Sequence, residues 1–336
     1  MQPHVTVLVA PDSFKGTFRA AEVAAAIGRG LERAGFAPDL APAADGGDGT
    51  MEVLLLALGG QTAAAEVHDP LGRPVTAGFG LLEEGGAAIV EMAQASGLQL
   101  VAEDERDPEA ATTVGTGELI LAARDAGADM VFVSVGGSAT TDGGAGALEA
   151  IERGGGLGGA RLVVLCDVRT PFERAAEVYG PQKGADAAAV RRLTRRLHRL
   201  AEGWPRDPRG APMTGAAGGL AGGLWAALGA ELVPGAAFVL DALGFDARLR
   251  AAGAVVTGEG RLDEQTLQGK VVGEVATRAR QRGVPCHAIV GRSELDRFGR
   301  RMLDLDSVTE ATSLEAIEAA ADALGARLPR LARRSS

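Results

Sequence analysis

The sequence predicts an α/β protein with two domains. Its 336 residues are more than one hydrophobic core usually organises, so a second domain is expected. Short segments rich in β-branched residues repeatedly run into glycine-rich turns, and these turns lead into segments with the spacing of helices. The segment 254–290 alternates strand, helix and strand, which is the unit from which parallel sheets are built.

The composition excludes several classes of protein. The net charge of −10 and the pI of about 5.1 argue against a nucleic-acid partner, because such a partner requires a basic surface. The basic segments 191–199 and 327–334 are interpreted as solvated helix faces. Cys166 and Cys286 show neither metal-ligand nor disulfide spacing, as expected in the cytoplasm. No secretion signal and no apolar run of roughly 18 residues is present, so no membrane partner is expected.

The histidines offer no catalytic pattern. No nucleophile elbow and no convincing Ser/His/Asp set is present. We expect each of the four to be structural or solvated: His4, His68, His198 and His287.

The segment 131–146, with the sequence VFVSVGGSATTDGGAG, is the central candidate site. An apolar strand enters a glycine-rich turn with small hydroxyls, and a helix is expected from Ala145. Backbone N–H groups and hydroxyls at the start of a helix bind anions. The carboxylate of Asp142 in the same turn suggests that a divalent cation enters with a nucleotide or other phosphate. The alternative is a plain junction in which Asp142 caps the helix.

The N-terminal strand, expected over 5–10, ends in a second candidate site. Asp12, Ser13 and Lys15 lie between it and a helix over 19–34, at the usual ligand edge of an α/β sheet. We expect Lys15 to bind a substrate or a phosphate, with a plain surface lysine as the alternative.

Two acidic residues, Asp45 and Asp48, stand among three glycines before a helix expected over 51–58. They suit a metal or the hydroxyl of a polar substrate, and a capped turn is the alternative. The threonine-rich segment 112–118, before a helix over 119–126, is likewise either an anion site or a helix cap.

Further elements connect these sites. Residues 61–82 predict a β-hairpin, and Lys183 lies between glycines in a loop over 180–184. In the glycine-rich stretch 215–223 we favour close packing over ligand binding. The other predicted elements are strands over 87–92 and 161–166, the latter followed by Asp167, and helices over 187–200 and up to Leu228.

The unit 254–290 carries an acidic, glycine-rich turn after its first strand. Its candidate residues are Gly258, Glu259, Gly260, Asp263 and, just before a helix over 271–282, Lys270. It is not a Walker A loop, because Val271 stands where that motif needs a hydroxyl. Glu259 and Asp263 either bind a metal or orient Arg261 and Lys270.

These turns together predict phosphoryl transfer. At least four strand-to-helix turns combine glycine with Asp or Glu, and two also contain lysine. Transfer of a phosphoryl group needs backbone donors for phosphate oxygens, carboxylates for Mg²⁺ and lysine for the developing charge. A dinucleotide-dependent enzyme would instead show a complete Gly-x-Gly-x-x-Gly fingerprint.

Five ordered motifs resemble those of the type I glycerate kinase family, the glycerate 2-kinase group. They are VAPDSFKG at 9–16, ADGGDGT at 44–50, VGGSATTDGGAG at 135–146, GPQKGA at 180–185 and TGEGRLD at 257–263. The resemblance implies phosphorylation of D-glycerate to 2-phosphoglycerate with ATP and Mg²⁺ as cofactors. Asp48 departs from the usual Glu of the family, and Thr141 from a common Asn.

The resemblance also implies a domain arrangement. A Rossmann-like parallel-sheet domain would be built from both chain ends, 1–60 with 255–336, and 61–254 would form an inserted α/β domain. The active site would lie in the interdomain cleft. The hairpin from Gln61 and the strand–helix–strand unit from Ala254 agree with these boundaries.

The site hypothesis assigns a role to each candidate. Substrate binding is expected of Asp12, Ser13 and Lys15, and catalysis of Lys15, Asp45, Asp48, Lys183 and Lys270. Cofactor binding is expected of Gly136, Gly137, Ser138, Thr140, Asp142, Gly258, Glu259 and Gly260. Metal binding is expected among Asp142, Asp167, Glu259 and Asp263.

Two alternatives to this function stay open. The protein could phosphorylate a different hydroxy acid, or it could be a sensor of phosphorylated metabolites that has lost turnover. A homodimer is open for the oligomeric state.

Overall fold

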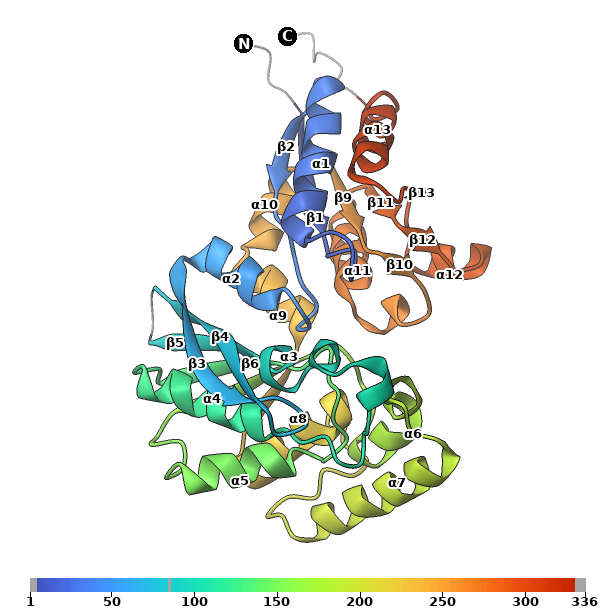
Figure 1. Cartoon of the computed structure of the whole chain (residues 1–336). Helices are drawn as coiled ribbons and strands as arrows, with labels where there is room; N and C mark the ends of the chain where they lie inside the picture. Colours follow the sequence, from blue (N-terminus) through green and yellow to red (C-terminus); the bar gives the residue numbers. More distant parts are fainter. Residues whose placement is uncertain (1–4, 84–85, 330–336) are drawn as a thin grey trace. The chain divides into compact units, whose positions relative to one another are not determined.

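The computed structural model describes residues 5–83 and 86–329 and shows an α/β protein (Figure 1). The chain divides into two compact units. The terminal unit comprises Met1–Asp45 and Val239–Ser336, and the central unit comprises Gly46–Phe238. His4 and the basic residues from Arg330 onward lie outside the described residues.

The terminal unit is built on a five-stranded sheet with all strands parallel, in the order β13-β11-β9-β1-β2. Its strands are β1 (Thr6–Pro11), β2 (Ala37–Leu40), β9 (Ala254–Gly258), β11 (Cys286–Val290) and β13 (Ser307–Glu310). The central strands β1, β9 and β11 are almost wholly buried. Continuous apolar runs are typical of parallel strands covered on both faces.

Helices cover both faces of this sheet. On one face, α1 (Ala20–Arg33) and α13 (Leu314–Gly325) pack together over Val9 and Val256. At Gly30 of α1 an added Cβ would collide with the backbone of α13, so this contact requires glycine. On the other face, α10 (Phe245–Ala251) and α11 (Val271–Arg282) pack against the central strands.

The central unit is built on a six-stranded mixed sheet in the order β3-β4-β5-β6-β7-β8. Its strands are β3 (Gly60–His68), β4 (Pro74–Leu82), β5 (Ala87–Glu91), β6 (Met130–Ser134), β7 (Arg161–Cys166) and β8 (Glu231–Pro234). The pairs β3–β4 and β4–β5 are antiparallel, and the remaining pairs are parallel. Its core includes side chains of α4 (Val114–Asp125), α5 (Ala145–Arg153) and α8 (Leu220–Leu228).

The remaining elements are short or peripheral. They are α2 (Thr50–Leu58), α3 (Ala93–Ser96), α6 (Ala175–Tyr179), α7 (Ala187–Glu202), α9 (Gly235–Ala242), α12 (Arg297–Met302), and the short strands β10 (Arg261–Leu262) and β12 (Arg292–Ser293). Within 5–83 and 86–329, no helix is both long and apolar enough to span a bilayer.

The sequence located most elements that have strong apolar patterns. The predicted hairpin is confirmed, and β7, α11 and β11 begin and end where predicted. The helix expected from Leu119 begins earlier, at Val114, because Gly115, Thr116 and Gly117 already form its first turn. The loop expected at 180–184 contains a turn of 3₁₀ helix over Pro181–Lys183. The sequence missed β2, β8 and β13, which are four residues long and contain no buried residue.

The glycine-rich stretch at 215–223 packs as predicted. Added Cβ atoms at Gly218 and Gly223 would collide with the backbone of Thr140 and Gly143, respectively. The stretch therefore lets α8 approach the turn after β6 closely.

The division into units differs from the predicted boundaries at 60/61 and 254/255. The helix α2 belongs to the central unit, where it packs against β4 and β5 and where the Met51 N–H donates to Glu91 Oε1 at 2.9 Å. The helix α10 belongs to the terminal unit, where it packs against β1 and α11. Tertiary packing, rather than a change of sequence pattern, thus determines where each unit ends.

Candidate active site

The candidate residues of the terminal unit surround one pocket of about 550 Å³. The pocket lies where the carboxyl ends of β1, β9 and β11 meet, since residues that directly follow each of these strands line it. This is the edge at which parallel α/β sheets usually bind ligands. Eight predicted residues line it, namely Asp12, Ser13, Lys15, Asp45, Glu259, Gly260, Asp263 and Lys270.

Asp12 is a buried carboxylate directly after β1. Its backbone N–H donates to Gly258 O at 2.8 Å, and its Oδ1 accepts the Ser13 N–H at 2.6 Å. Burial and the nearby carboxylate of Asp45 raise the pKa of Asp12 well above its usual value, although Lys15 opposes this shift. A hydroxyl or cation that reaches Asp12 would therefore meet a carboxyl group that has little access to water.

Lys15 and Asp45 form an ion pair in this pocket, with 3.3 Å between Nζ and Oδ2. The side chain of Lys15 is 52% exposed, whereas that of Asp45 is buried. Lys15 is thus a charged group at the mouth of a pocket, which favours the ligand-binding hypothesis over a plain surface lysine.

Glu259 follows β9 and is also buried. Its Oε1 accepts the Thr266 hydroxyl at 2.6 Å. Burial raises the pKa of Glu259 to about 7, while the Thr266 hydrogen bond and the charge of Lys270 oppose this shift. A carboxyl group with such a pKa exchanges its proton near neutral pH, which is the range required of a general base or acid.

The pocket has a buried acidic floor and a more exposed basic rim. The floor comprises Asp12, Asp45 and Glu259. The rim comprises Lys15, Arg261, Lys270 and Arg292. The rim suits a carboxylate or phosphate, and the floor suits hydroxyl groups or a cation. Sequence reasoning missed Arg292, although its position directly after a buried strand and a glycine was a usable signal.

The candidate residues of the central unit gather at the turn after β6. The Val135 N–H donates to Gly46 O at 3.0 Å, so the segment that begins at Gly46 lies against this turn. A Cβ at Gly136 would meet the backbone of Gly47, and one at Gly137 would lie 2.8 Å from Asp48 Oδ1. The two glycines therefore permit close approach of the Asp48 loop, and they bring together two motifs far apart in sequence.

Lys183 is buried beside the same turn, with only 1% of its surface exposed. Its Nζ donates to Ser138 Oγ at 2.7 Å and to Thr140 O at 2.6 Å. Burial lowers the pKa of Lys183 to about 7, and the charge of Asp142 opposes this shift. Lys183 thus ties the glycine-rich turn to the 3₁₀ helix over Pro181–Lys183.

Asp142 has a structural role that favours the capping alternative over the expected metal and cofactor roles. Its Oδ2 accepts the Thr113 N–H at 2.9 Å, the Thr113 hydroxyl at 2.8 Å and the Gly146 N–H at 3.2 Å. Its Oδ1 accepts the Gly144 N–H at 3.0 Å. These bonds satisfy donors at the starts of α4 and α5. They also leave little of the carboxylate for a metal.

Thr113 connects the same two helices, since its hydroxyl also accepts the Ala147 N–H at 3.0 Å. The hydroxyl of Thr113 therefore caps the start of α5, whereas at the start of its own helix, α4, Thr113 makes no side-chain cap bond.

The other predicted metal ligands do not form a preformed metal centre. In the part of the chain that the structure describes, no group of three or more His, Cys, Asp or Glu side chains is arranged to hold a metal ion. Asp167 follows β7 in the central unit, whereas Glu259 and Asp263 belong to the terminal unit. Glu259 and Asp263 do offer oxygen donors in one pocket, and Mg²⁺ in such sites usually shares its coordination with waters and substrate phosphates. This pair therefore fits a magnesium ion that arrives with a nucleotide.

The comparisons with known proteins agree on one family. The family model described as the glycerate kinase family matches residues 7–154 and 155–334. A glycerate kinase of Halalkalibacterium halodurans is 41% identical over 325 residues, with 85% of each chain covered. The glycerate 2-kinase of Escherichia coli is 39% identical over 324 residues, with 85% of this chain and 84% of that protein covered.

A solved structure supports the same assignment. It is a crystal structure provisionally described as glycerate kinase 2 from Salmonella typhimurium LT2, and it is 36% identical to this chain. The TM-score is 0.80, with 97% of this chain and 98% of that chain covered. On these findings the chain belongs to the glycerate kinase family and is an enzyme, a kinase.

Proposed function

We propose that the protein phosphorylates D-glycerate at its 2-hydroxyl, using ATP and Mg²⁺, and releases 2-phosphoglycerate. The family membership and the names of the relatives support glycerate as the acceptor. The observation that carries the proposal is the terminal-unit pocket, whose basic rim and acidic floor match a small hydroxy acid.

In this proposal the terminal unit binds D-glycerate. Lys15 pairs with the substrate carboxylate, and Arg261 and Arg292 provide further positive charge at the rim. Asp12 and Ser13 hydrogen-bond the substrate hydroxyls. Asp45, held by Lys15, orients the acceptor hydroxyl, and we keep Asp48 as a second candidate for this role.

Glu259 is our candidate for the group that removes the acceptor proton. Its pKa of about 7 allows it to be ionised before transfer and to hold the proton afterwards. If Glu259 instead binds Mg²⁺ together with Asp263, the metal would hold it ionised, and Asp45 would be the remaining base. The dependence of turnover on pH in the presence of saturating Mg²⁺ separates these two roles.

The central unit supplies the nucleotide site in this proposal. Backbone N–H groups of Gly136 and Gly137 and the hydroxyls of Ser138 and Thr140 would bind phosphate oxygens. Lys183, which already bonds Ser138 and Thr140, holds this turn in place and neutralises the transferred phosphoryl, as Lys270 could also do. Bound Mg²⁺ would supply charge neutralisation of the phosphates.

The experiment is a coupled assay of ADP release with D-glycerate, L-glycerate and other small hydroxy acids. D-Glycerate should have the highest kcat/KM. NMR of the product distinguishes the two hydroxyls, because the phosphorus of 2-phosphoglycerate couples to a single carbon-bound proton. A higher kcat/KM for another hydroxy acid would contradict the acceptor. ATP binding without any ADP release would favour a sensor.

The remaining expectations stay predictions. They are the active site in an interdomain cleft, the cytoplasmic location and the homodimer.

A further inference from the structure

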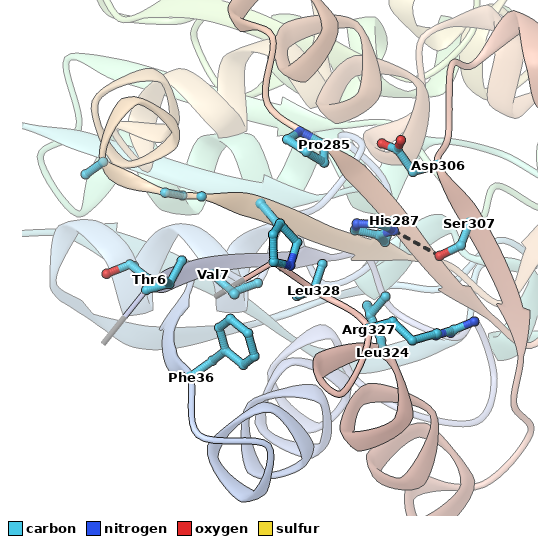
Figure 2. Close-up of a pocket in the computed structure, with 16 residues that line it drawn as sticks. Thr6, Val7, Phe36, Pro285, His287, Asp306, Ser307, Leu324, Arg327 and Leu328 are labelled. Carbon is cyan, nitrogen blue, oxygen red and sulfur yellow. Dashed lines mark hydrogen bonds between the residues drawn. The ribbon is translucent and has the colours of Figure 1, made fainter. Parts of the chain in front are cut away.

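The terminal unit contains a second pocket, of about 910 Å³, at the amino edge of its parallel sheet (Figure 2). Thr6, Ala254 and Ser307, the first residues of β1, β9 and β13, line it. The candidate active site follows the carboxyl ends of the same sheet, about 17–20 Å away along strands of this length. The pocket is therefore a separate site, and its volume is typical of pockets for small organic ligands.

The pocket has an apolar side and a polar side. In Figure 2, Val7 and Phe36 lie on one side, whereas His287, Asp306 and Ser307 lie together on the other. Leu324 and Leu328, at the end of α13 and just beyond it, add apolar surface. Such an arrangement suits a ligand with an apolar body and one polar group.

His287 carries an unsatisfied polar atom on this polar side. The residue is 8% exposed, and its Nδ1 lies 2.9 Å from Ser307 Oγ. Its Nε2 is buried, with no hydrogen-bond partner within residues 5–83 and 86–329. In Figure 2 the edge of the ring opposite Ser307 points toward the other labelled side chains. Nε2 itself is covered, so a ligand reaches it when a covering side chain moves aside. A buried polar group without a partner is unfavourable, so a ligand that pairs with it gains affinity.

The charges around the pocket favour an uncharged ligand. Burial lowers the pKa of His287, which therefore stays neutral near pH 7. The charge of Asp306 raises this pKa, and the charge of Arg327 lowers it. These two residues carry opposite charges at the same pocket, so neither sign dominates. Burying a ligand ion beside the apolar side would cost free energy, and a pocket with one charge of each sign does not offset that cost.

We propose that this pocket binds a small, uncharged aromatic molecule that carries a hydroxyl group. The aromatic ring packs against Phe36 and the leucines, and the hydroxyl pairs with Nε2 of His287. A hydroxyl suits this atom because it both donates and accepts, so it pairs with either tautomer of the imidazole.

The test uses 2-naphthol and the full-length protein labelled with ¹³C-histidine. Four histidines produce four Cε1–H signals, and the variant His287→Gln identifies one of them by its loss. We expect 2-naphthol to shift the His287 signal saturably and to leave the signals of His68 and His198 in place. The absence of a saturable shift of the His287 signal would overturn the proposal.

Two further probes separate the hydroxyl from the ring and from charge. 2-Methylnaphthalene has the ring without the hydroxyl, and 2-naphthoate replaces the hydroxyl with a carboxylate. 2-Methylnaphthalene should bind about threefold to tenfold more weakly than 2-naphthol, as the loss of one hydrogen bond predicts. 2-Naphthoate should also bind more weakly, because its charge would be buried beside the apolar side. Equal or tighter binding of 2-methylnaphthalene would overturn the role of the hydroxyl, and equal or tighter binding of 2-naphthoate would overturn the preference for an uncharged ligand.

Variants locate the binding. His287→Phe should weaken 2-naphthol binding about threefold to tenfold, and the control His198→Phe should not change it. Because His287→Phe could destabilise the sheet, Thr6→Trp provides a second test, since it fills the pocket from β1 and should abolish the shift. Unchanged binding in Thr6→Trp would place the probe elsewhere and refute the site.

Discussion

The two units bury opposite charges beside their candidate sites. The terminal unit buries the carboxyl groups of Asp12, Asp45 and Glu259 and places cations at the pocket rim. The central unit buries the ammonium group of Lys183 and holds it with a hydroxyl and a carbonyl oxygen. Burial favours the neutral form of each group, so it raises the pKa of Glu259 and lowers that of Lys183 toward the same value of about 7. The same desolvation by burial thus shifts the pKa of an acid and the pKa of a base in opposite directions.

The largest expected effect comes from Lys183→Met, which keeps the length of the side chain and removes its charge. We expect turnover to fall about 10²–10³-fold, as the loss of a preorganised electrostatic group does in other enzymes. Steady-state ADP release measures this loss. Lys183→Arg is the matched control, because it keeps the positive charge but places a different side chain in the buried space that lysine occupies. If Lys183→Met retained near-normal kcat, the buried cation of the central unit would have no part in catalysis.

Lys15→Ala should lower turnover on the order of a hundredfold, because it removes the cation that pairs with Asp45 and, in our proposal, with the substrate. Lys15→Arg should recover part of the loss. The melting temperature should also fall, because the change takes the cation away from the buried carboxylate of Asp45, so it is measured beside the kinetics. Near-normal kinetics of Lys15→Ala would show that the basic rim does not bind the substrate.

The dependence of stability on pH should differ in sign between the two units. The folded pKa of Glu259 is raised from 4.5 to about 7, so its contribution is complete at low pH and is lost as the pH rises across this interval. The folded pKa of Lys183 is lowered from 10.5 to about 7, so its contribution is present at high pH and is lost as the pH falls toward about 7. Glu259 therefore makes the protein less stable at neutral pH than at acidic pH, and Lys183 makes it less stable at neutral pH than at alkaline pH.

Melting temperatures of the wild type, Glu259→Gln and Lys183→Met across these two intervals measure the difference. Glu259→Gln should flatten the acidic interval only, and Lys183→Met the alkaline interval only. A variant whose profile matched the wild type would show that the group it replaces does not titrate as its burial requires.

The smallest expected effect is structural. Asp142→Asn should destabilise the central unit by about 1–3 kcal/mol, because the amide nitrogen cannot accept the bonds that one carboxylate oxygen now accepts. The dependence of activity on Mg²⁺ should stay unchanged, as it should in the comparison variant Glu149→Gln on the exposed face of α5. A shift in the Mg²⁺ requirement of Asp142→Asn would restore Asp142 as a metal ligand.

The sequence by itself determined the class of fold and most of the candidate residues. Buried strands such as β1, β7 and β11 were recognisable because parallel strands covered on both faces are continuously apolar. Several turns were recognisable as candidate sites because they repeat glycine with carboxylates, and in two cases lysine, at the strand ends where α/β sheets bind ligands.

Only the tertiary structure decided what the individual polar residues do. Asp142 and Glu259 both follow strands in glycine-rich turns, yet the first is saturated by hydrogen bonds from two helices and the second faces a pocket. The sequence could not show the burial of Lys183. It also could not show that Nε2 of His287 has no hydrogen-bond partner among the described residues. The physical reason is that burial and hydrogen-bond partners come from segments distant along the chain, which local patterns do not record.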